Sequence, residues 1–546
     1  MRTEKLQMWQ ERLRASEAAY EAELYRMDER DALYQGKAAL RPITKGDTQT
    51  KAYHVRNICA ELIEAQISDG IPRPKVTACR REDEPKAKLI EDMLRNELDR
   101  LPFERLNDIL SRVVLIQGGG GILLEWDNTR TSHSTVGELS VSPIHPRQFI
   151  PQEGVYSSVE DMDYFILKIP QTKEGIRRKY GVCVEEESES EPEVKGPGEN
   201  AASEMVTQYM AYYRNESGGI GMFSWVNDVT LADHTEYQAR LREEDGAEPQ
   251  GGFVLRSDGS MIPTEQIPPY SPRLYPLILV KNVSVFGKLL GDSDIDKIAD
   301  QQNTTNRIES KIIDKLMKSG SYITLPDDAS IRADAEDMKV IRPGNAAEKS
   351  LIDVYDLQGN IHQDMLYLSQ VYEEARQALG ITDSFLGRAD RTAVSGRAKE
   401  IAASQSAGRL ESKRAMKEAA YAELFEAMFR FKLAYADEPR PVVSGDLRGN
   451  PIYSEFNRYD FLERDAAGAL YWNDRFLFSC DRTDTQTGNR ELMWQETRLN
   501  LQSGAFGNPT ALETLVLFWS RMELLHYPGA AETKAYLNEL RAGSAN

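Results

Sequence analysis

Apolar and polar positions follow helical spacing in two long segments of the second half of the chain. Mostly apolar residues recur at steps of three, four or seven in residues 294–318 and 359–379. These steps place one narrow stripe on each helix, and at about 1.5 Å per residue each helix is roughly 30–40 Å long. Because helices this long with so thin a stripe cannot bury themselves in a monomer of ordinary shape, the pattern predicts an assembly. We expect these stripe residues to lie at an interface between subunits: Ile298, Ile312, Leu316, Ile361, Met365 and Leu368.

The first half of the chain predicts helices followed by strands. Helices are expected over 4–35, 57–68 and 82–117, the last one broken near Leu101-Pro102, and strands over 122–126, 164–169, 205–213, 220–226 and 277–280. A glycine run, Gly118 to Gly121, precedes the first strand. It lacks the Gly-Lys-Ser/Thr of a phosphate-binding loop, and its helix-to-strand order is the reverse of such a loop. We therefore interpret it as a helix end and a tight turn.

The insert between the two long helices, residues 319–357, contains two strand-like runs at 322–325 and 338–341. This pattern predicts a small β element at the far tip of a helical hairpin. Its charged residues suggest a docking surface for a partner: Asp327, Asp328, Arg332, Asp334, Glu336 and Asp337.

A third and longer helix is expected over 393–437. The chain then returns to strands, notably at 474–479, before Asn508-Pro509 opens a helix over 510–525 and a final helix ends near Arg541. An N-cap residue followed by proline is typical of a helix start. Helices and strands grouped in this way predict an α+β fold.

Composition favours a globular protein of several folded units. The chain has 546 residues, of which 40% are hydrophobic and 28% charged. No run of about eighteen apolar residues suggests a membrane span, and the first residues predict a helix rather than a signal peptide, which favours a cytoplasmic site of synthesis.

The four cysteines form no CxxC pair, so we expect buried, reduced thiols. The acidic segment 184–204 predicts a solvated loop, with an acidic lure for a basic partner as the alternative.

Motifs that carry chemistry are absent from the sequence. The six histidines are scattered without an HxH or HExxH pair. Asp292-x-Asp-x-Asp296 resembles the start of a calcium loop, but Lys297 stands where that loop needs glycine. No Walker A motif, nucleophile elbow or nuclease-type carboxylate cluster is present. We therefore expect a protein that is not an enzyme and that needs no metal or cofactor.

The charge distribution is uneven. The formal net charge is −20, which argues against a conventional DNA-binding protein because tight binding needs several Lys/Arg–phosphate contacts. Acidity also suits a passage through which DNA must slide, since an acidic wall repels the phosphate backbone, although solubility alone is the simpler explanation. Residues 381–417 differ from the rest, because eight basic and four acidic side chains give them a net charge of +4.

Two passages resemble the portal proteins of tailed bacteriophages of the siphophage type. Residues 283–307 read VSVFGKLLGDSDIDKIADQQNTTNR, which is similar to the passage of these proteins from wing to stem. Residues 379–387 read LGITDSFLG and residues 392–402 read TAVSGRAKEIA, which are similar to the tunnel loop and the start of the kinked helix after it. The order of parts fits over nearly the whole chain, and only the acidic segment 184–204 looks like an addition.

The resemblance implies a portal fold with a mixed α/β wing, a stem, a clip, a tunnel loop and a helical crown. It divides the chain into the first wing part at 1–290, stem helices at 291–318 and 358–380, the clip at 319–357, the tunnel loop at 381–392, the long kinked helix at 393–437, the β return of the wing at 438–507 and the crown at 508–546.

A portal ring, usually of twelve subunits, occupies one vertex of the capsid in the virion after assembly in the host cytoplasm. The resemblance implies that double-stranded DNA passes through the channel without sequence specificity, driven by the terminase large subunit. It also implies contacts with head-completion or adaptor proteins, the major capsid protein and scaffolding proteins. DNA-contact residues are expected in the tunnel loop and the helix after it: Arg388, Arg391, Arg397 and Lys399. The alternatives are a purely structural capsid or scaffolding protein and a DNA-processing packaging enzyme.

Overall fold

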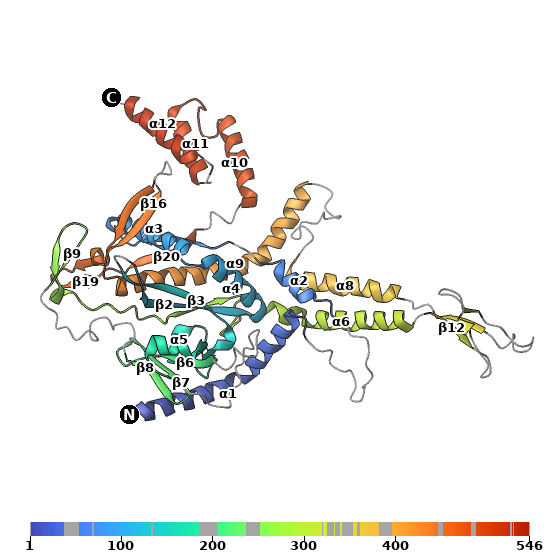
Figure 1. Ribbon diagram of the computed structural model, residues 1–546. Helices are drawn as coiled ribbons and strands as arrows, with labels where there is room; N and C mark the ends of the chain where they lie inside the picture. Colours follow the sequence, from blue (N-terminus) through green and yellow to red (C-terminus); the bar gives the residue numbers. More distant parts are fainter. Residues whose placement is uncertain are drawn as a thin grey trace, which may run out of the picture.

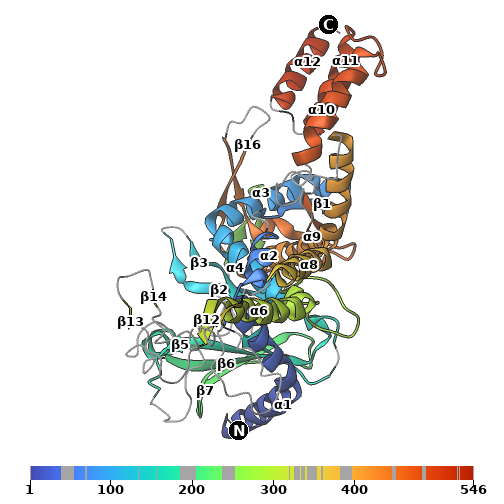
Figure 2. The same cartoon turned by 90° about the vertical axis from the view of Figure 1, so that its right-hand side faces the viewer.

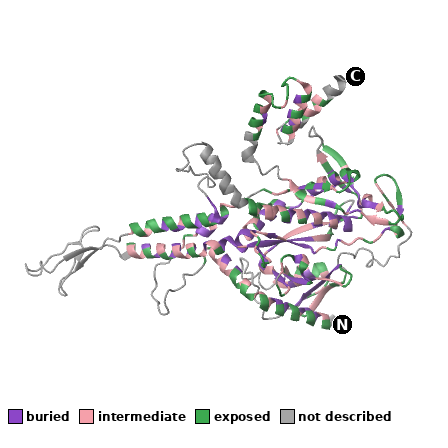
Figure 3. Ribbon diagram, turned by 180° about the vertical axis from the view of Figure 1, so that it is seen from behind, coloured by how far each residue is buried: buried purple, intermediate pink, exposed green. Residues whose placement is uncertain are grey.

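The protein is a mixed helix-and-sheet molecule, 50% helical and 25% strand, which confirms the α+β class. The computed structural model describes residues 2–37, 54–67, 70–132, 135–154, 156–184, 205–235, 252–318, 320–324, 332–333, 339–340, 353–357, 361–381, 396–445, 451–481, 487–524, 527 and 529–544. Figure 1 shows a body of sheets and helices, a helical hairpin that projects from it, and a group of helices at the C-terminal end. The buried residues, purple in Figure 3, concentrate in the body.

The largest sheet of the body is antiparallel and has the strand order β4-β5-β6-β7-β8. Helix α1 covers one face of this sheet, where Trp9 packs against Tyr164 and Phe223. The other face packs against the neighbouring sheet through an apolar layer that includes Phe165 and Leu277. The elements are α1 (Arg2–Tyr34), β4 (Phe149–Pro151), β5 (Tyr164–Thr172), α5 (Lys173–Tyr180), β6 (Met205–Arg214), β7 (Ile220–Val226) and β8 (Val229–His234).

The second sheet, of order β11-β2-β3, leads into the main core. Helices α3, α4 and α9 pack around it, and the second half of α9 is buried through residues such as Tyr421, Phe425 and Phe429. The elements are α3 (Glu84–Arg100), α4 (Phe103–Gln117), β2 (Gly119–Thr131), β3 (Val136–Ile144), β11 (Leu277–Lys281) and α9 (Gly396–Tyr435). In Figure 1, α9 is bent, and its first part is tilted away from the part that crosses the body.

Short two-stranded sheets complete the body. They pair β1 with β20, β9 with β10, β16 with β17, and β18 with β19. Their bounds are β1 (Arg73–Ala78), β9 (Phe253–Leu255), β10 (Met261–Pro263), β16 (Arg440–Gly445), β17 (Pro451–Phe456), β18 (Leu462–Arg464), β19 (Leu470–Trp472) and β20 (Phe476–Asp481).

The helical hairpin consists of α6 (Asp294–Lys318) and α8 (His362–Leu379), which pack side by side. The short helix α2 (Ile58–Glu64) lies against its base. Beyond the helices, β12 (Gly320–Thr324) pairs with β15 (Asp353–Leu357), and β13 (Arg332–Ala333) pairs with β14 (Lys339–Val340). Figure 1 shows this β element at the end of the hairpin that is far from the body.

The C-terminal helices are α10 (Thr487–Gln502), α11 (Leu512–Leu524) and α12 (Ala530–Ser544). An aromatic cluster holds them together, with Trp494 and Trp519 against Tyr527 at ring-centroid distances of 5.0 and 6.1 Å. Figures 1 and 2 show that these helices stand at one end of the molecule, beyond α3 and β16.

Several elements agree with the sequence pattern and others differ. Helix α6 has the predicted bounds, and Leu101 and Pro102 separate α3 from α4 as expected. Strand β2 is longer than predicted, and α5, β3, β15 and α10 were not predicted. Helix α10 lies within the range 438–507 that was assigned to a β return, and it packs against α11.

The cysteine prediction is only partly confirmed. All four thiols are free and Cys59 is buried, but Cys79 and Cys183 are exposed, because they lie where the chain leaves β1 and α5. Residues 185–204 of the predicted acidic loop lie outside the described residues. Among the helices that the structure describes, none is long and apolar enough to span a bilayer.

Candidate functional site

The hairpin is attached to the body at a crossing of two glycines. Gly118 ends α4 with a φ of +83°, and a Cβ at this position would lie 2.4 Å from the carbonyl oxygen of Gly291. A Cβ on Gly291 would lie 2.5 Å from the carbonyl oxygen of Val283. Only glycine allows such close approach and a left-handed backbone together. The predicted helix end at Gly118 is confirmed, and the glycine lets the segment leading into α6 pass against the body.

The start of α6 is fixed by a cap and by an ion pair. The Ser293 hydroxyl accepts hydrogen bonds from the backbone N–H groups of Ile295 (3.1 Å) and Asp296 (3.4 Å), as an N-cap does. Arg30 of α1 donates two hydrogen bonds to the Asp296 carboxylate, from Nε (2.9 Å) and from a terminal nitrogen (2.6 Å). A bidentate pair fixes direction as well as distance, so α1 sets the orientation of the hairpin.

Asp294, the first residue of α6, connects the hairpin to α9. Its side chain is fully buried and forms an ion pair with Lys413 of α9. The same carboxylate accepts hydrogen bonds from Asn282 (3.0 Å) and Lys297 (3.2 Å). Burial lowers the pKa of Lys413, and Asp294 offsets part of that effect. Lys413 is one of the eight basic residues of the segment 381–417, and Asp294 balances its charge inside the fold.

Polar residues on one side of α6 hold the segment that contains α2. The buried Gln302 amide donates to the Arg56 carbonyl oxygen (2.7 Å) and accepts from the Cys59 N–H (3.0 Å). Further along α6, the Ser310 hydroxyl accepts from the His54 N–H (3.1 Å). Gln302 thus satisfies backbone groups that the interior would otherwise leave without partners.

Helix α8 is joined to α6 at both ends of their contact. At the base, Ala375 and Leu379 pack with Ile298 and α2 in one apolar cluster. Farther out, Asp364 of α8 forms ion pairs with Lys311 (3.1 Å) and Lys315 of α6. The hydrogen bonds of both lysines lower the pKa of Asp364.

The stripe residues expected at a subunit interface divide into two groups within the single chain. Ile298, Ile312 and Leu368 are buried by their own chain, and Ile361 is half-buried. Leu316 and Met365 remain 50% and 54% exposed. Next to Met365 on α8, Leu366 and Tyr367 are 59% and 50% exposed, so the outer part of the hairpin presents a group of apolar side chains to its surroundings. Contiguous exposed apolar residues are typical of an interaction surface.

Most of the other predicted site residues lie outside the described residues. This holds for the DNA-contact candidates Arg388 and Arg391 and for the docking candidates Asp327, Asp328, Asp334, Glu336 and Asp337. Arg397 and Lys399 lie in the first turn of α9, and Arg332 lies in β13, but only their backbone is described.

The chain matches no family model and no curated protein. The hairpin with its attachment is therefore interpreted from the residues and the geometry of this chain alone.

The part of the chain that the structure describes offers no metal centre. There, His, Cys, Asp and Glu side chains form no group of three that could hold a metal ion. At the hairpin base Arg30 binds the Asp296 carboxylate, and Asn282 and Lys413 bind the Asp294 carboxylate. Gln302 binds backbone groups there. Sequence reasoning missed this network because its members come from distant segments with no shared spacing.

Proposed function

We propose that this chain is the subunit of a portal ring, the channel at one vertex of a tailed-phage capsid through which genomic DNA is packaged, retained and ejected. One observation carries the proposal: two long antiparallel helices project from an α/β body, bear a β element at their far end, and are followed in the chain by a long bent helix that returns across the body (Figure 1). The order of these parts supports the resemblance of residues 283–307 and 379–402.

In this proposal each part of the molecule has a role in the ring. The body is the wing, α6 and α8 are the stem, the strands β12 to β15 belong to the clip, α9 is the kinked helix after the tunnel loop, and α11 and α12 lie in the crown. The exposed apolar residues of the outer hairpin, Leu316, Met365, Leu366 and Tyr367, meet the stem of a neighbouring subunit.

The charge of the chain suits a channel in which DNA slides. Each subunit contributes a net charge of −20, and a wall of this sign repels phosphates within the Debye length of about 10 Å at 0.1 M salt. The basic residues Arg388, Arg391, Arg397 and Lys399 supply transient phosphate contacts within that background. Such contacts are weak and salt-screened, so they touch the duplex without halting it.

Partners follow from the same assignment. The clip binds the terminase large subunit, whose ATPase drives packaging, and later the head-completion or adaptor proteins. The wing contacts the major capsid and scaffolding proteins. The portal itself performs no covalent chemistry and needs no cofactor.

Negative-stain imaging of the purified protein tests the proposal. A portal gives rings with a central hole. Closed shells or sheets would favour the structural capsid alternative, and ATP turnover by the purified chain would favour a packaging enzyme.

A further inference from the structure

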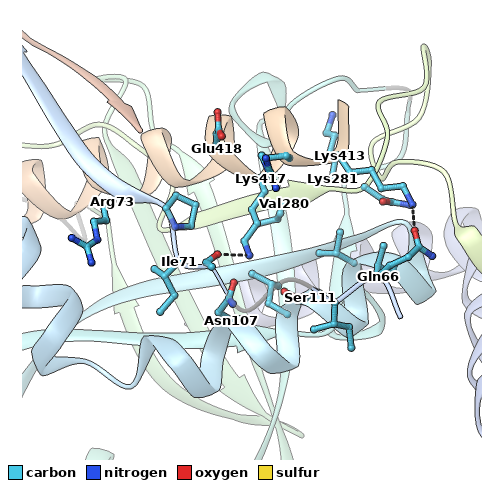
Figure 4. A pocket seen from close by; sticks show the side chains of 18 of the residues that line it. Gln66, Ile71, Arg73, Asn107, Ser111, Val280, Lys281, Lys413, Lys417 and Glu418 are labelled. Carbon is cyan, nitrogen blue, oxygen red and sulfur yellow. Dashed lines mark hydrogen bonds between the residues drawn. The ribbon is translucent and has the colours of Figure 1, made fainter. Parts of the chain in front are cut away.

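A cavity of about 420 Å³ lies between α9, α4, β11 and the described residues 66, 67 and 70–73 on either side of the gap between α2 and β1. Figure 4 shows it from close by, with α9 on one side and α4 on the other. Apolar side chains form much of its wall, among them Ile71, Leu110, Val114 and Val280. Ligand pockets of small molecules typically measure about 300–1,000 Å³ and have largely apolar walls, so this cavity has room for an organic ligand.

Cationic side chains of α9 cross the cavity or stand at its edge. Lys417 donates to the carbonyl oxygen of Gly70 (3.0 Å), and Lys413 donates to the Gln66 side chain (2.8 Å), as the dashed lines in Figure 4 show. Arg414 also lines the cavity; it is exposed, and it forms no ion pair with any residue that the structure describes.

The charge of the lining is opposite to that of the chain. Five basic residues line the cavity against two acidic ones, in a protein with a net charge of −20. Asp294 balances the charge of one of the five, Lys413, and the other four still outnumber the acidic residues. The basic residues are Arg73, Lys281, Lys413, Arg414 and Lys417, and the acidic ones are Glu418 and Asp481. A locally positive, partly apolar concavity in an acidic molecule selects for anions that also carry apolar surface.

We propose that this cavity is a binding site for a small organic anion with an apolar body. The apolar body packs against Leu110, Val114 and Ile71, while the anionic group is bound at the open side by the Arg414 guanidinium. An aliphatic carboxylate and a nucleoside monophosphate both combine an anionic group with a surface that packs against apolar side chains. This surface is the alkyl chain in the first and the faces of the base in the second, and both molecules fit the volume. The site does not depend on ring formation or on DNA passage.

Calorimetric titration of the full-length protein with octanoate and, separately, with adenosine monophosphate tests the site. Saturable binding of one of them is expected, and which one binds identifies the source of the anion. Arg414→Met should weaken binding about tenfold, the usual effect of losing one charge-assisted hydrogen bond. Ser111→Trp, which fills the cavity from α4, should abolish it.

Controls separate this site from general anion binding. Arg14→Met removes an exposed arginine of α1 and should leave binding unchanged. Ser111→Leu fills less space and covers the case in which the tryptophan variant fails to fold. The proposal is overturned if neither ligand saturates, if Arg414→Met and both Ser111 variants bind as well as the unaltered protein, or if inorganic phosphate alone binds as tightly.

Discussion

Lys413 of α9 forms an ion pair with Asp294, the first residue of α6, and the two side chains are only 16% and 0% exposed. This pair joins two helices that are separated by more than a hundred residues of sequence. It lies beside the crossing of Gly118 and Gly291, where the hairpin leaves the body. The position of the hairpin is thus coupled to the position of α9.

The first prediction concerns this coupling. Asp294→Asn or Lys413→Met should each lower the free energy of unfolding by about 3–5 kcal/mol, because removing one partner leaves a buried charge uncompensated. The double variant should lose less than the sum of the two. Urea unfolding followed by circular dichroism measures these values.

The partly exposed pair Lys534–Glu523 of the C-terminal helices provides the matched control. Its single variants Lys534→Met and Glu523→Gln should each cost less than about 1 kcal/mol, as partly exposed pairs do. Equal losses for both pairs, or strict additivity for Asp294 and Lys413, would show that the buried pair does not couple the helices.

The second prediction concerns assembly of the ring through the hairpin. Leu366→Asp places a charge on an exposed position of α8 and should leave the subunit folded while breaking rings into smaller species. Leu368→Asp should instead destabilise the subunit itself, because Leu368 is 6% exposed within its own chain. Light scattering measures particle size, and circular dichroism checks the fold.

Leu499→Asp is the control for this prediction, since Leu499 of α10 is 62% exposed and lies away from the hairpin. It should leave the rings intact. Rings of unchanged size in Leu366→Asp would remove the outer hairpin from the subunit interface.

The third prediction concerns acid stability. Burial tends to raise the pKa of Glu463, but hydrogen bonds from Lys86, Asn473 and Tyr471 outweigh it and lower the pKa from 4.5 to about 2. A carboxyl group whose pKa is lower in the folded than in the unfolded state stabilises the fold at pH values above its unfolded pKa. This stabilisation is lost as the pH falls from about 4.5 to 2. Glu463→Gln should therefore cost about 1 kcal/mol at pH 7, after allowance for screening by solvent.

Thermal unfolding between pH 7 and pH 3 measures this effect. The difference in melting temperature between Glu463→Gln and the unaltered protein should stay constant from pH 7 to about pH 4.5 and shrink as the pH falls from there to 3. Glu265→Gln, at an exposed position, should unfold like the unaltered protein throughout. A difference that stays constant with pH would mean that the Glu463 carboxylate contributes only by packing.

Local signals account for the elements that the sequence predicted well. Ser293 caps α6, and the stripe of Ile298 and Ile312 lies on its buried side, so both the start and the face of this helix are encoded locally. The glycines after Gly118 gave a weaker signal. They predict a turn, yet Gly120 lies in β2 and pairs with Val280 of β11. A Cβ there would lie 2.8 Å from the end of the Leu110 side chain, which would have to move.

Other features depend on contacts that no local pattern reveals. Helix α10 is stabilised by Trp494 against Tyr527, more than thirty residues further along the chain. The network at the hairpin base draws Arg30, Asn282 and Lys413 from separate segments. From sequence, Lys413 is one basic residue among several, and its partner Asp294 is an ordinary helix-start aspartate.

The fourth prediction concerns the proposed tunnel loop. Arg388→Ala combined with Arg391→Ala should leave ring assembly intact and impair late packaging or retention of DNA, when the packaged genome pushes outward. The length of the genome in mutant particles measures this. Arg14→Ala, on the outer helix α1, is the control and should package normally. Full-length and stably retained genomes in the double variant would mean that these arginines are structural.

We propose that copies of this chain form a ring whose channel is bordered by the α6–α8 hairpins. Single-particle cryo-electron microscopy of the purified full-length protein tests it most directly. We expect rings with an open centre, with the hairpins side by side around the axis and the outer residues Met365 and Leu366 against a neighbouring subunit. A monomer at micromolar concentration, or an assembly in which the hairpins point away from the axis and touch no neighbour, would contradict it.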